Sequence, residues 1–212
     1  MNETQSSPWL AIPLADYERH MSAASVAQAA MLSDTLHQLV MASRPKSLAL
    51  LGSAGGNGLE RIDPLVTRRV VAVDLNAAFL EACGARHAQR FNKFEPVHCD
   101  LSDGLPFSDP VDLVYAALVV EYLDQDAFLA YAPSLVTNDG RIAFVFQNRD
   151  ERATPVSDSG VHSLQWLSAV HTAVDVDRLA EVLQSRDMKV ADRRAIASAP
   201  GKLFTLLVVA KH

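Results

Sequence analysis

The chain has 212 residues, of which 49% are hydrophobic, and carries a formal net charge of −6. This length suits one α/β domain with a sizeable core, and we expect no second globular domain. The sequence has no long basic run of the kind that follows a phosphate backbone, so nucleic acid is not the expected partner.

Cysteine usage and hydropathy favour a cytoplasmic protein. Cys83 and Cys99, expected on a helix and in a strand, are too few for a disulfide framework and do not form a metal-ligand pair. The N-terminal residues have no basic region leading into an apolar core, and no apolar run approaches membrane-spanning length. We expect neither export nor membrane insertion. We also expect no metal, because the acidic and histidine residues lack ligand spacing.

Residues 1–46 precede the first predicted strand. Within them, Ser25 to Ala42 carries apolar residues at helical spacing and is expected to pack on the sheet. Pro45 ends this helix. A second apolar face on the helix would allow two copies of the chain to dimerise, and the sequence leaves the oligomeric state open.

A glycine-rich turn then follows a buried strand. The apolar run Ser47–Leu51 predicts a strand that is buried on both faces. In the turn Gly52–Gly58, glycines permit positive φ and let a ligand approach main-chain N–H groups at the start of a helix. Val70–Val73 is the next strand, and Asp74 at its end can accept hydrogen bonds from ribose hydroxyls. Residues 47–74 therefore predict a nucleotide-binding βαβ unit.

Each part of this unit also has a simpler interpretation, in which the glycines only make a tight turn and Asp74 only caps the following helix. The dehydrogenase pattern G-x-G-x-x-G fails here, because Ala54 and Arg61 stand where glycines belong. A Walker phosphate loop fails as well, since the turn contains no lysine. A nicotinamide-dependent oxidoreductase therefore stays as a weaker alternative.

The remaining elements alternate between strands and helices. Gly104–Pro110 marks an irregular link, Gly140 a turn, and Asn148–Gly160 a polar, mobile loop over the carboxyl edge of the sheet. Two C-terminal strands around the turn-forming cluster Ser198–Gly201 predict a hairpin. We expect strands over Val97–Leu101, Asp112–Ala117, Arg141–Phe146, Val190–Ala197 and Leu203–Lys211, and helices over Asn76–Arg90, Asp124–Leu135 and Asp175–Arg186.

The glycine-rich turn resembles the first motif of class I S-adenosylmethionine-dependent methyltransferases, an apolar strand with an acid followed by G-x-G-x-G. Leu50 stands where the family commonly has its acid, and Ala54 stands at the middle glycine. Asp74 resembles the acid of the second motif. Asp100 and Leu101 resemble the residues that meet the adenine amino group and ring. The segment Trp9–Met21 is similar to the lead segment of small bacterial members whose substrates are mostly unassigned.

The resemblance implies a Rossmann-like, doubly wound, mostly parallel sheet with an antiparallel C-terminal hairpin strand. Residues 47–212 would form the methyltransferase domain, and residues 1–46 a helical cap or lid. A surface helix anchored by Trp9 and Tyr17 is the competing interpretation of the lid. The implied cofactor is S-adenosylmethionine, bound by Tyr17, His20, Gly52, Ser53, Ala54, Gly56, Asn57, Asp74, Leu75, Asp100, Leu101, Ala116 and Ala117.

Glu121 and Tyr122 are the candidate catalytic residues, because they follow the fourth strand, where the family faces its acceptor. Glu121, in apolar surroundings, could bind an amine, accept a proton or orient a neighbour; as a structural residue it would meet backbone N–H groups at a helix start. Gln147 could donate to an acceptor oxygen, or it could satisfy loop backbone. His171, near the polar loop, could contact the substrate, but it is more readily expected at the surface.

The expected reaction is methyl transfer to a small molecule by in-line displacement, in which positioning and exclusion of water supply much of the rate. Tyr115–Leu118 replaces the Asn/Asp-Pro-Pro-aromatic motif that similar enzymes use on planar nitrogens. Methylation of nucleic-acid bases or glutamine amides is therefore disfavoured. The departures at Leu50 and Ala54 motivate a second hypothesis, a cofactor-binding module that has lost its chemistry.

Overall fold

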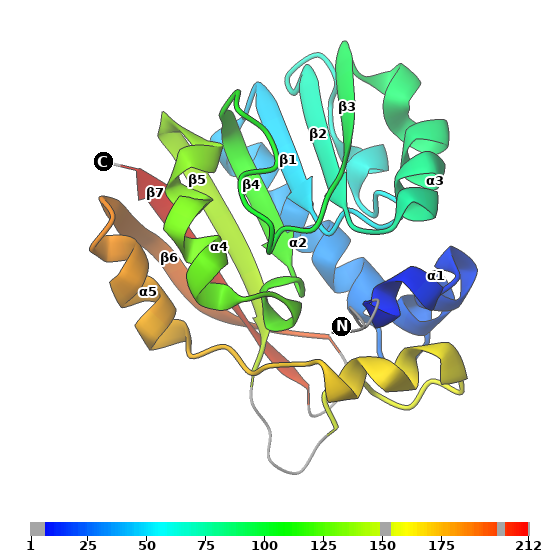
Figure 1. The fold of residues 1–212 in the computed structure, drawn as a ribbon. Coiled ribbons are helices and arrows are strands. Elements are labelled where there is room, and N and C mark those ends of the chain that lie inside the picture. The colour runs from blue at the N-terminus through cyan, green and yellow to red at the C-terminus, as the bar shows by residue number, and fades with distance from the viewer. Residues whose placement is uncertain (1–6, 149–153, 199–201, 212) are drawn as a thin grey trace, which may run out of the picture.

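A computed structural model describes residues 7–148, 154–198 and 202–211 (Figure 1). Its centre is a seven-stranded sheet of order β3-β2-β1-β4-β5-β7-β6. Strands β1 to β5 run parallel, and β7 lies antiparallel between β5 and β6. This arrangement confirms the expected fold class and its C-terminal hairpin. The strands are β1 (Ser47–Leu51), β2 (Arg69–Asp74), β3 (Lys93–His98), β4 (Val111–Ala117), β5 (Val136–Gln147), β6 (Met188–Ala197) and β7 (Leu203–Lys211).

Helices cover both faces of the sheet. Alternate residues of β1 point to opposite faces, so Leu48 and Leu50 join one core cluster while Ala49 and Leu51 join the other. Helices α2 and α3 pack on the first face, and α4 and α5 pack on the second (Figure 1). The α-helices are α1 (Leu14–Ser22), α2 (Gln28–Ser43), α3 (Ala77–His87), α4 (Gln125–Tyr131) and α5 (Val176–Gln184).

The prediction of an α-helix between β1 and β2 is wrong. The connection contains only a short 3-10 helix, η2 (Leu59–Arg61). Ala54, Gly56 and Gly58 all have positive φ, which a right-handed helix cannot accommodate. Pro64 then disfavours helical backbone at the residue before it. The stretch left between these limits is too short to sustain an α-helix, so only the 3-10 helix η2 follows the glycine-rich turn.

Several predicted boundaries also shift for local reasons. Helix α2 begins at Gln28 rather than Ser25, because Ala27 adopts a left-handed conformation with φ of 50°. Helix α4 ends at Tyr131 and continues as a 3-10 turn, where Pro133 lacks an N–H donor. The third strand begins earlier than expected and ends at His98, so the prediction of Cys99 in a strand is wrong.

Gly140 lies inside strand β5 rather than in a separate turn. Val111 pairs with Val136 but Leu113 pairs with Arg141, so β5 carries an irregularity at this point. The irregular link before β4 is confirmed, since residues 99–110 contain neither helix nor strand. Within the described residues, no helix has the length and apolar character needed to cross a membrane.

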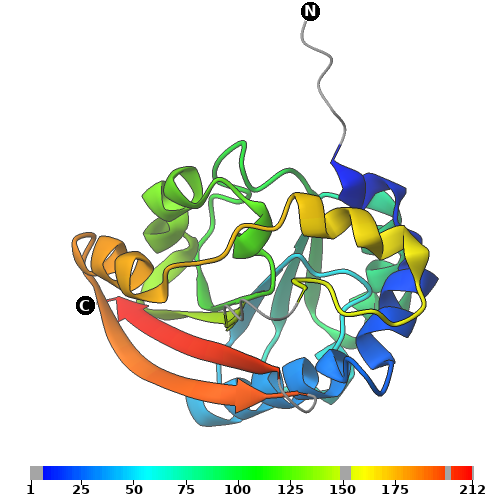
Figure 2. The same ribbon diagram turned by 90° about the horizontal axis from the view of Figure 1, so that it is seen from below.

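The polar segment after β5 lies partly outside the described residues, at positions 149–153. Residues 154–160 have no helix or strand, and a 3-10 helix that was not expected, η6 (His162–Ala169), follows them. Figure 2 shows this yellow segment beside the blue N-terminal helices. Ile12 of the N-terminal segment and Leu164 and Leu167 of η6 share one small buried cluster. Residues 8–22, which contain η1 (Pro8–Ala11) and α1, cover the carboxyl edge of the central strands together with η6, and we call these two segments the cap.

Candidate active site

The cleft at the carboxyl ends of β1, β2 and β4 brings most of the predicted cofactor residues together. In this sheet order the chain leaves β1 toward β2 on one side, while β4 lies on the other, and such switch points bind ligands in α/β proteins. The cleft has a volume of about 100 Å³. The predicted cofactor residues that line it are Tyr17, Gly52, Ala54, Asp74, Leu75, Asp100, Leu101 and Ala117.

Asp74 connects the second strand to the glycine-rich turn. Its Oδ2 accepts a hydrogen bond from the Ala54 N–H at 2.8 Å, and its Oδ1 accepts one from the Asn76 N–H at 2.9 Å. Burial raises the pKa of the Asp74 carboxyl, and these N–H donors act in the opposite direction. Each oxygen keeps a second lone pair, so the carboxylate can still accept ribose hydroxyls.

The backbone conformation at position 52 requires a glycine. Its φ is 66°, and a Cβ at this position would lie 3.0 Å from Cγ2 of Val119. The absence of a side chain therefore keeps this wall of the cleft open to a ligand at the end of β1.

Aromatic residues of the cap close the cleft. The Trp9 ring lies 5.0 Å from the Tyr122 ring and 6.0 Å from the Tyr17 ring, and Tyr17 lies 5.9 Å from Phe79, all measured between centroids. The Asn76 side chain donates to the Trp9 carbonyl at 3.0 Å, which ties the cap to the start of α3. Burial raises the pKa of the Tyr17 hydroxyl well above its usual value, so Tyr17 stays neutral.

Glu121 lies in a second, smaller pocket of about 50 Å³, next to the cleft. The side chain belongs to a 3-10 helix, η4 (Val120–Tyr122), and Glu121 is only 1% exposed. Its Oε1 accepts a hydrogen bond from the Gln147 N–H at 2.9 Å, while no described residue is a partner of Oε2. Burial raises the pKa of Glu121 to about 7. The Gln147 N–H that it meets belongs to β5.

The sequence did not predict that His20, Gln147 and His171 would share this pocket with Glu121. Tyr122 separates the pocket from the cleft, since it lines both, and its ring lies 5.5 Å from the His171 ring. His20 lines the small pocket rather than the cleft. His171, expected at the surface, is only partly exposed. These residues come from segments far apart in the chain, so no local pattern could have joined them.

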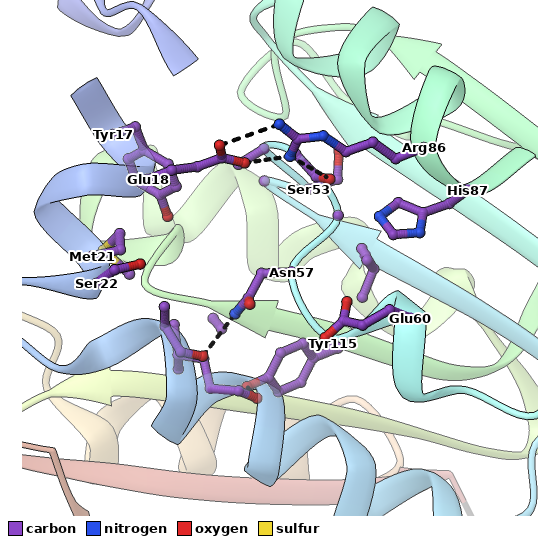
Figure 3. A pocket seen from close by; sticks show the side chains of 18 of the residues that line it. Tyr17, Glu18, Met21, Ser22, Ser53, Asn57, Glu60, Arg86, His87 and Tyr115 are labelled. Atoms are coloured by element: carbon purple, nitrogen blue, oxygen red, sulfur yellow. Dashed lines mark hydrogen bonds and ion pairs between the residues drawn. The ribbon is translucent and has the colours of Figure 1, made fainter. Parts of the chain in front are cut away.

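The remaining predicted cofactor residues lie elsewhere. Ser53, Gly56 and Asn57 line a third cavity behind the glycine-rich turn (Figure 3), not the cleft that contains Asp74. Ala116 is fully buried within β4 and lines none of the three cavities. In the part of the chain that the structure describes, no three His, Cys, Asp or Glu side chains gather closely enough to hold a metal ion.

A mostly parallel sheet with an antiparallel β7 and an acidic residue at the tip of β2 defines the class: a Rossmann-like fold of the methyltransferase type. Residues 50–144 match the family model described as "Methyltransferase domain". Residues 50–144 therefore contain a methyltransferase domain, and the fold around them is that of class I S-adenosylmethionine-dependent methyltransferases, whose cofactor is S-adenosylmethionine.

Solved structures share this fold at low sequence identity. Magnesium protoporphyrin IX methyltransferase (ChlM) from Synechocystis PCC 6803, with bound SAH, has a TM-score of 0.70 at 11% identity over 93% of this chain and 94% of that chain. 1,6-Didemethyltoxoflavin-N1-methyltransferase from Burkholderia thailandensis has a TM-score of 0.62 at 16% identity, and the match covers 100% of this chain and 93% of that chain. The [4+2]-cyclase SpnF has a TM-score of 0.63 at 14% identity, and the match covers 84% of this chain and 81% of that chain. None of the curated proteins matches the chain significantly.

Proposed function

We propose that the protein transfers a methyl group from S-adenosylmethionine to a small-molecule acceptor by direct in-line displacement. The observation that carries the proposal is the adjacency of two pockets: a cleft that contains Asp74 and Asp100, and a pocket that contains Glu121. Tyr122 lies at their junction, because it lines both. When bound, the cofactor supplies an electrophilic methyl group.

The residues of the cleft suit the adenosine part of this cofactor. Asp74 would hold the ribose hydroxyls, Asp100 the adenine amino group, and Leu75, Phe79 and Leu101 the faces of the ring. The cleft of about 100 Å³ is smaller than the roughly 300–1,000 Å³ of typical ligand sites, so the cap has to move to admit the whole cofactor. In this proposal the part of residues 1–46 that belongs to the cap is a lid on the domain formed by residues 47–212, while α2 stays packed on the sheet.

Glu121 would act on the acceptor as a proton acceptor or as an ammonium-binding carboxylate. Its Oε2 has no hydrogen-bond partner among the described residues, and burial raises its pKa to about 7. A general base works best when its pKa lies near the operating pH. Tyr122, whose pKa is raised by burial, stays protonated and would position the acceptor by packing and by its hydroxyl.

A small-molecule acceptor is supported by two of the structural neighbours, the methyltransferases of magnesium protoporphyrin IX and of 1,6-didemethyltoxoflavin. It is also supported by the net charge of −6 and the absence of a basic run in the sequence. Cys83 and Cys99 are free thiols, which agrees with a reducing compartment, and we propose the cytoplasm.

The test is methylation of a metabolite extract with labelled S-adenosylmethionine, followed by identification of the product by mass spectrometry. A labelled product that disappears with Glu121→Gln supports both the reaction and the residue. Calorimetry with S-adenosylhomocysteine (SAH) distinguishes an active methyltransferase from a cofactor-binding module without chemistry, the alternative that Leu50 and Ala54 motivate. Such a module binds SAH but labels no product. Failure to bind SAH at millimolar concentration contradicts both.

A further inference from the structure

A cavity of about 530 Å³ lies behind the glycine-rich turn, between helices α1, α2 and α3 (Figure 3). It occupies the side of the sheet on which the β1–β2 connection forms only the 3-10 helix η2. Its volume falls within the range of about 300–1,000 Å³ that is typical of small-molecule sites. The cavity shares Tyr17, Gly52, Ala54 and Ala117 with the cofactor cleft, but most of its wall is different.

Two buried polar atoms in this cavity lack partners. The Oγ of Ser53, a residue that is 6% exposed, has no hydrogen-bond partner among the described residues, and neither has Nδ1 of His87, which is 8% exposed. Ser53 lines this cavity and neither of the other two. A buried hydroxyl without a partner costs about 1–3 kcal/mol, and native proteins rarely keep one without a reason. A ligand that bonds to these atoms supplies that reason.

Part of the lining favours a ligand with an apolar body. Met21, Leu32 and Leu50 are apolar, and the Tyr115 ring is held in place because its hydroxyl donates to the Leu32 carbonyl at 3.1 Å.

The charges at the rim do not cancel completely. Figure 3 shows Glu18 of α1 paired with Arg86 of α3 across the rim, so these two charges offset each other. Glu60 accepts the Gly58 N–H at 3.0 Å and makes no ion pair with a described residue. Burial lowers the pKa of His87, so its ring is neutral near pH 7. Among the residues that line the cavity, one carboxylate charge therefore remains; Arg90, whose guanidinium donates to the Glu60 carbonyl at 2.9 Å, lies outside the lining.

We propose that this cavity is a second ligand site, separate from the cofactor cleft, and that it binds a small organic amine with an apolar body. The ammonium group would lie near Glu60 and Ser53, and the body would pack against Met21, Leu32 and Tyr115. No part of this site requires that the protein transfers a methyl group.

The first test compares three probes of one shape with the full-length protein by calorimetry: phenethylamine, 2-phenylethanol and 3-phenylpropionate. The amine is expected to bind at least tenfold more tightly than the alcohol, and the carboxylate more weakly still. Glu60→Gln should remove the preference for the amine. The proposal is overturned if the amine does not bind at millimolar concentration, or if either of the other probes binds as tightly.

The second test locates the site. Ala29 lines the cavity on α2, whereas the neighbouring Ala30 is exposed, so Ala29→Trp fills the cavity and Ala30→Trp is its matched control. We expect Ala29→Trp to weaken amine binding at least tenfold and to leave SAH binding unchanged, and Ala30→Trp to change neither. Amine binding that survives Ala29→Trp in a folded protein places the ligand elsewhere and overturns the proposal.

Ser53→Ala keeps the test decisive if Ala29→Trp does not fold. Because the Ser53 hydroxyl has no described partner, its removal should not lower the melting temperature. Loss of one hydrogen bond to the ligand should weaken amine binding about three- to tenfold. Unchanged amine affinity in Ser53→Ala contradicts the proposed contact.

Discussion

The carboxylate of Asp74 accepts a hydrogen bond from the backbone N–H of Ala54 at 2.8 Å, so the residue that ends β2 also fixes the turn that follows β1. Ala54 has a φ of 44°, in the left-handed region that favours glycine. The family's usual glycine would adopt this backbone without a Cβ penalty. Here the Asp74 contact offsets part of that cost, which couples the acid of the second motif to the geometry of the first.

Asp74→Ala should therefore weaken cofactor binding and also destabilise the fold. Loss of charge-assisted hydrogen bonds to the ribose, at about 1.5–3 kcal/mol, corresponds to a roughly 10- to 100-fold weaker affinity for SAH. Two backbone N–H groups would lose their acceptor at the same time, at about 1–3 kcal/mol of folding stability. Calorimetry with SAH and urea unfolding measure the two effects, and unchanged SAH affinity would remove Asp74 from the site.

Glu121→Gln should change the pH dependence of stability. Since burial raises the pKa of Glu121 to about 7 from a usual value of 4.5, the folded state binds more protons than the unfolded chain between these pH values. The stability of the wild-type protein therefore falls as pH rises from about 4.5 to 7, by about 3 kcal/mol in total. Gln has no charge to bury, so the variant should be the more stable protein at pH 8 and lose most of this advantage near pH 4.5.

The same substitution tests the catalytic role. If Glu121 accepts a proton from the acceptor, the rate of methyl transfer rises with pH through an apparent pKa of about 7, and Glu121→Gln loses this rise along with about 10²- to 10⁴-fold in rate. SAH affinity, measured by calorimetry, should stay within about twofold of the wild-type value. A variant that keeps both its rate and its pH profile would make Glu121 a structural residue only.

Trp9 should report on closure of the cap. The chain has two tryptophans, and Trp166 is 74% exposed, so Trp166→Phe leaves Trp9 as the single indole without disturbing the core. Binding of SAH should then change the fluorescence of Trp9, because its ring packs against Tyr17 and Tyr122 over the cleft. Trp9→Ala should weaken SAH binding about tenfold and Trp166→Ala should not. Equal effects of the two alanine variants would argue for a surface helix instead of a lid.

The central strands β1, β2 and β4 were readable from the sequence because burial on both faces demands uninterrupted apolar runs. Ser47–Leu51 was predicted at its observed bounds, and Asp74 was placed correctly at the tip of β2. The missing helix after β1 was not predicted, because an alanine does not mark position 54 as left-handed, although Gly56, Gly58 and Pro64 limit the stretch that a helix could use. Its conformation depends on the contact to Asp74, which forms only once the two strands are paired.

The candidate site was likewise predictable from the sequence only in part. Residues at strand ends converge because parallel strands end at one edge of a sheet, so Gly52 and Asp74 were placed together from the order of the strands, and Asp100 was added from the family resemblance. The partners of Glu121 were not, because Gln147 and His171 reach it from β5 and from the segment after η6. Ser53 lies between Gly52 and Ala54, which both have positive φ, and the sequence does not reveal that this backbone places Ser53 on the far side of the turn.

Asp112 provides a matched contrast to Asp74, because it performs the same backbone contact at the opposite end of the sheet. Its Oδ2 accepts hydrogen bonds from the N–H groups of Lys46 at 2.8 Å and Ser47 at 3.0 Å, where β1 begins. Asp112→Ala leaves both donors without this acceptor, and we expect a loss of about 1–3 kcal/mol in the free energy of unfolding.

The same variant should bind SAH with wild-type affinity, since Asp112 lines none of the three cavities. Unfolding in urea and calorimetry on Asp112→Ala and Asp74→Ala, measured side by side, separate the two roles of a strand-end carboxylate. If both variants lose SAH binding to the same extent, the loss follows from a weakened sheet, and the direct contact of Asp74 with the ribose is contradicted.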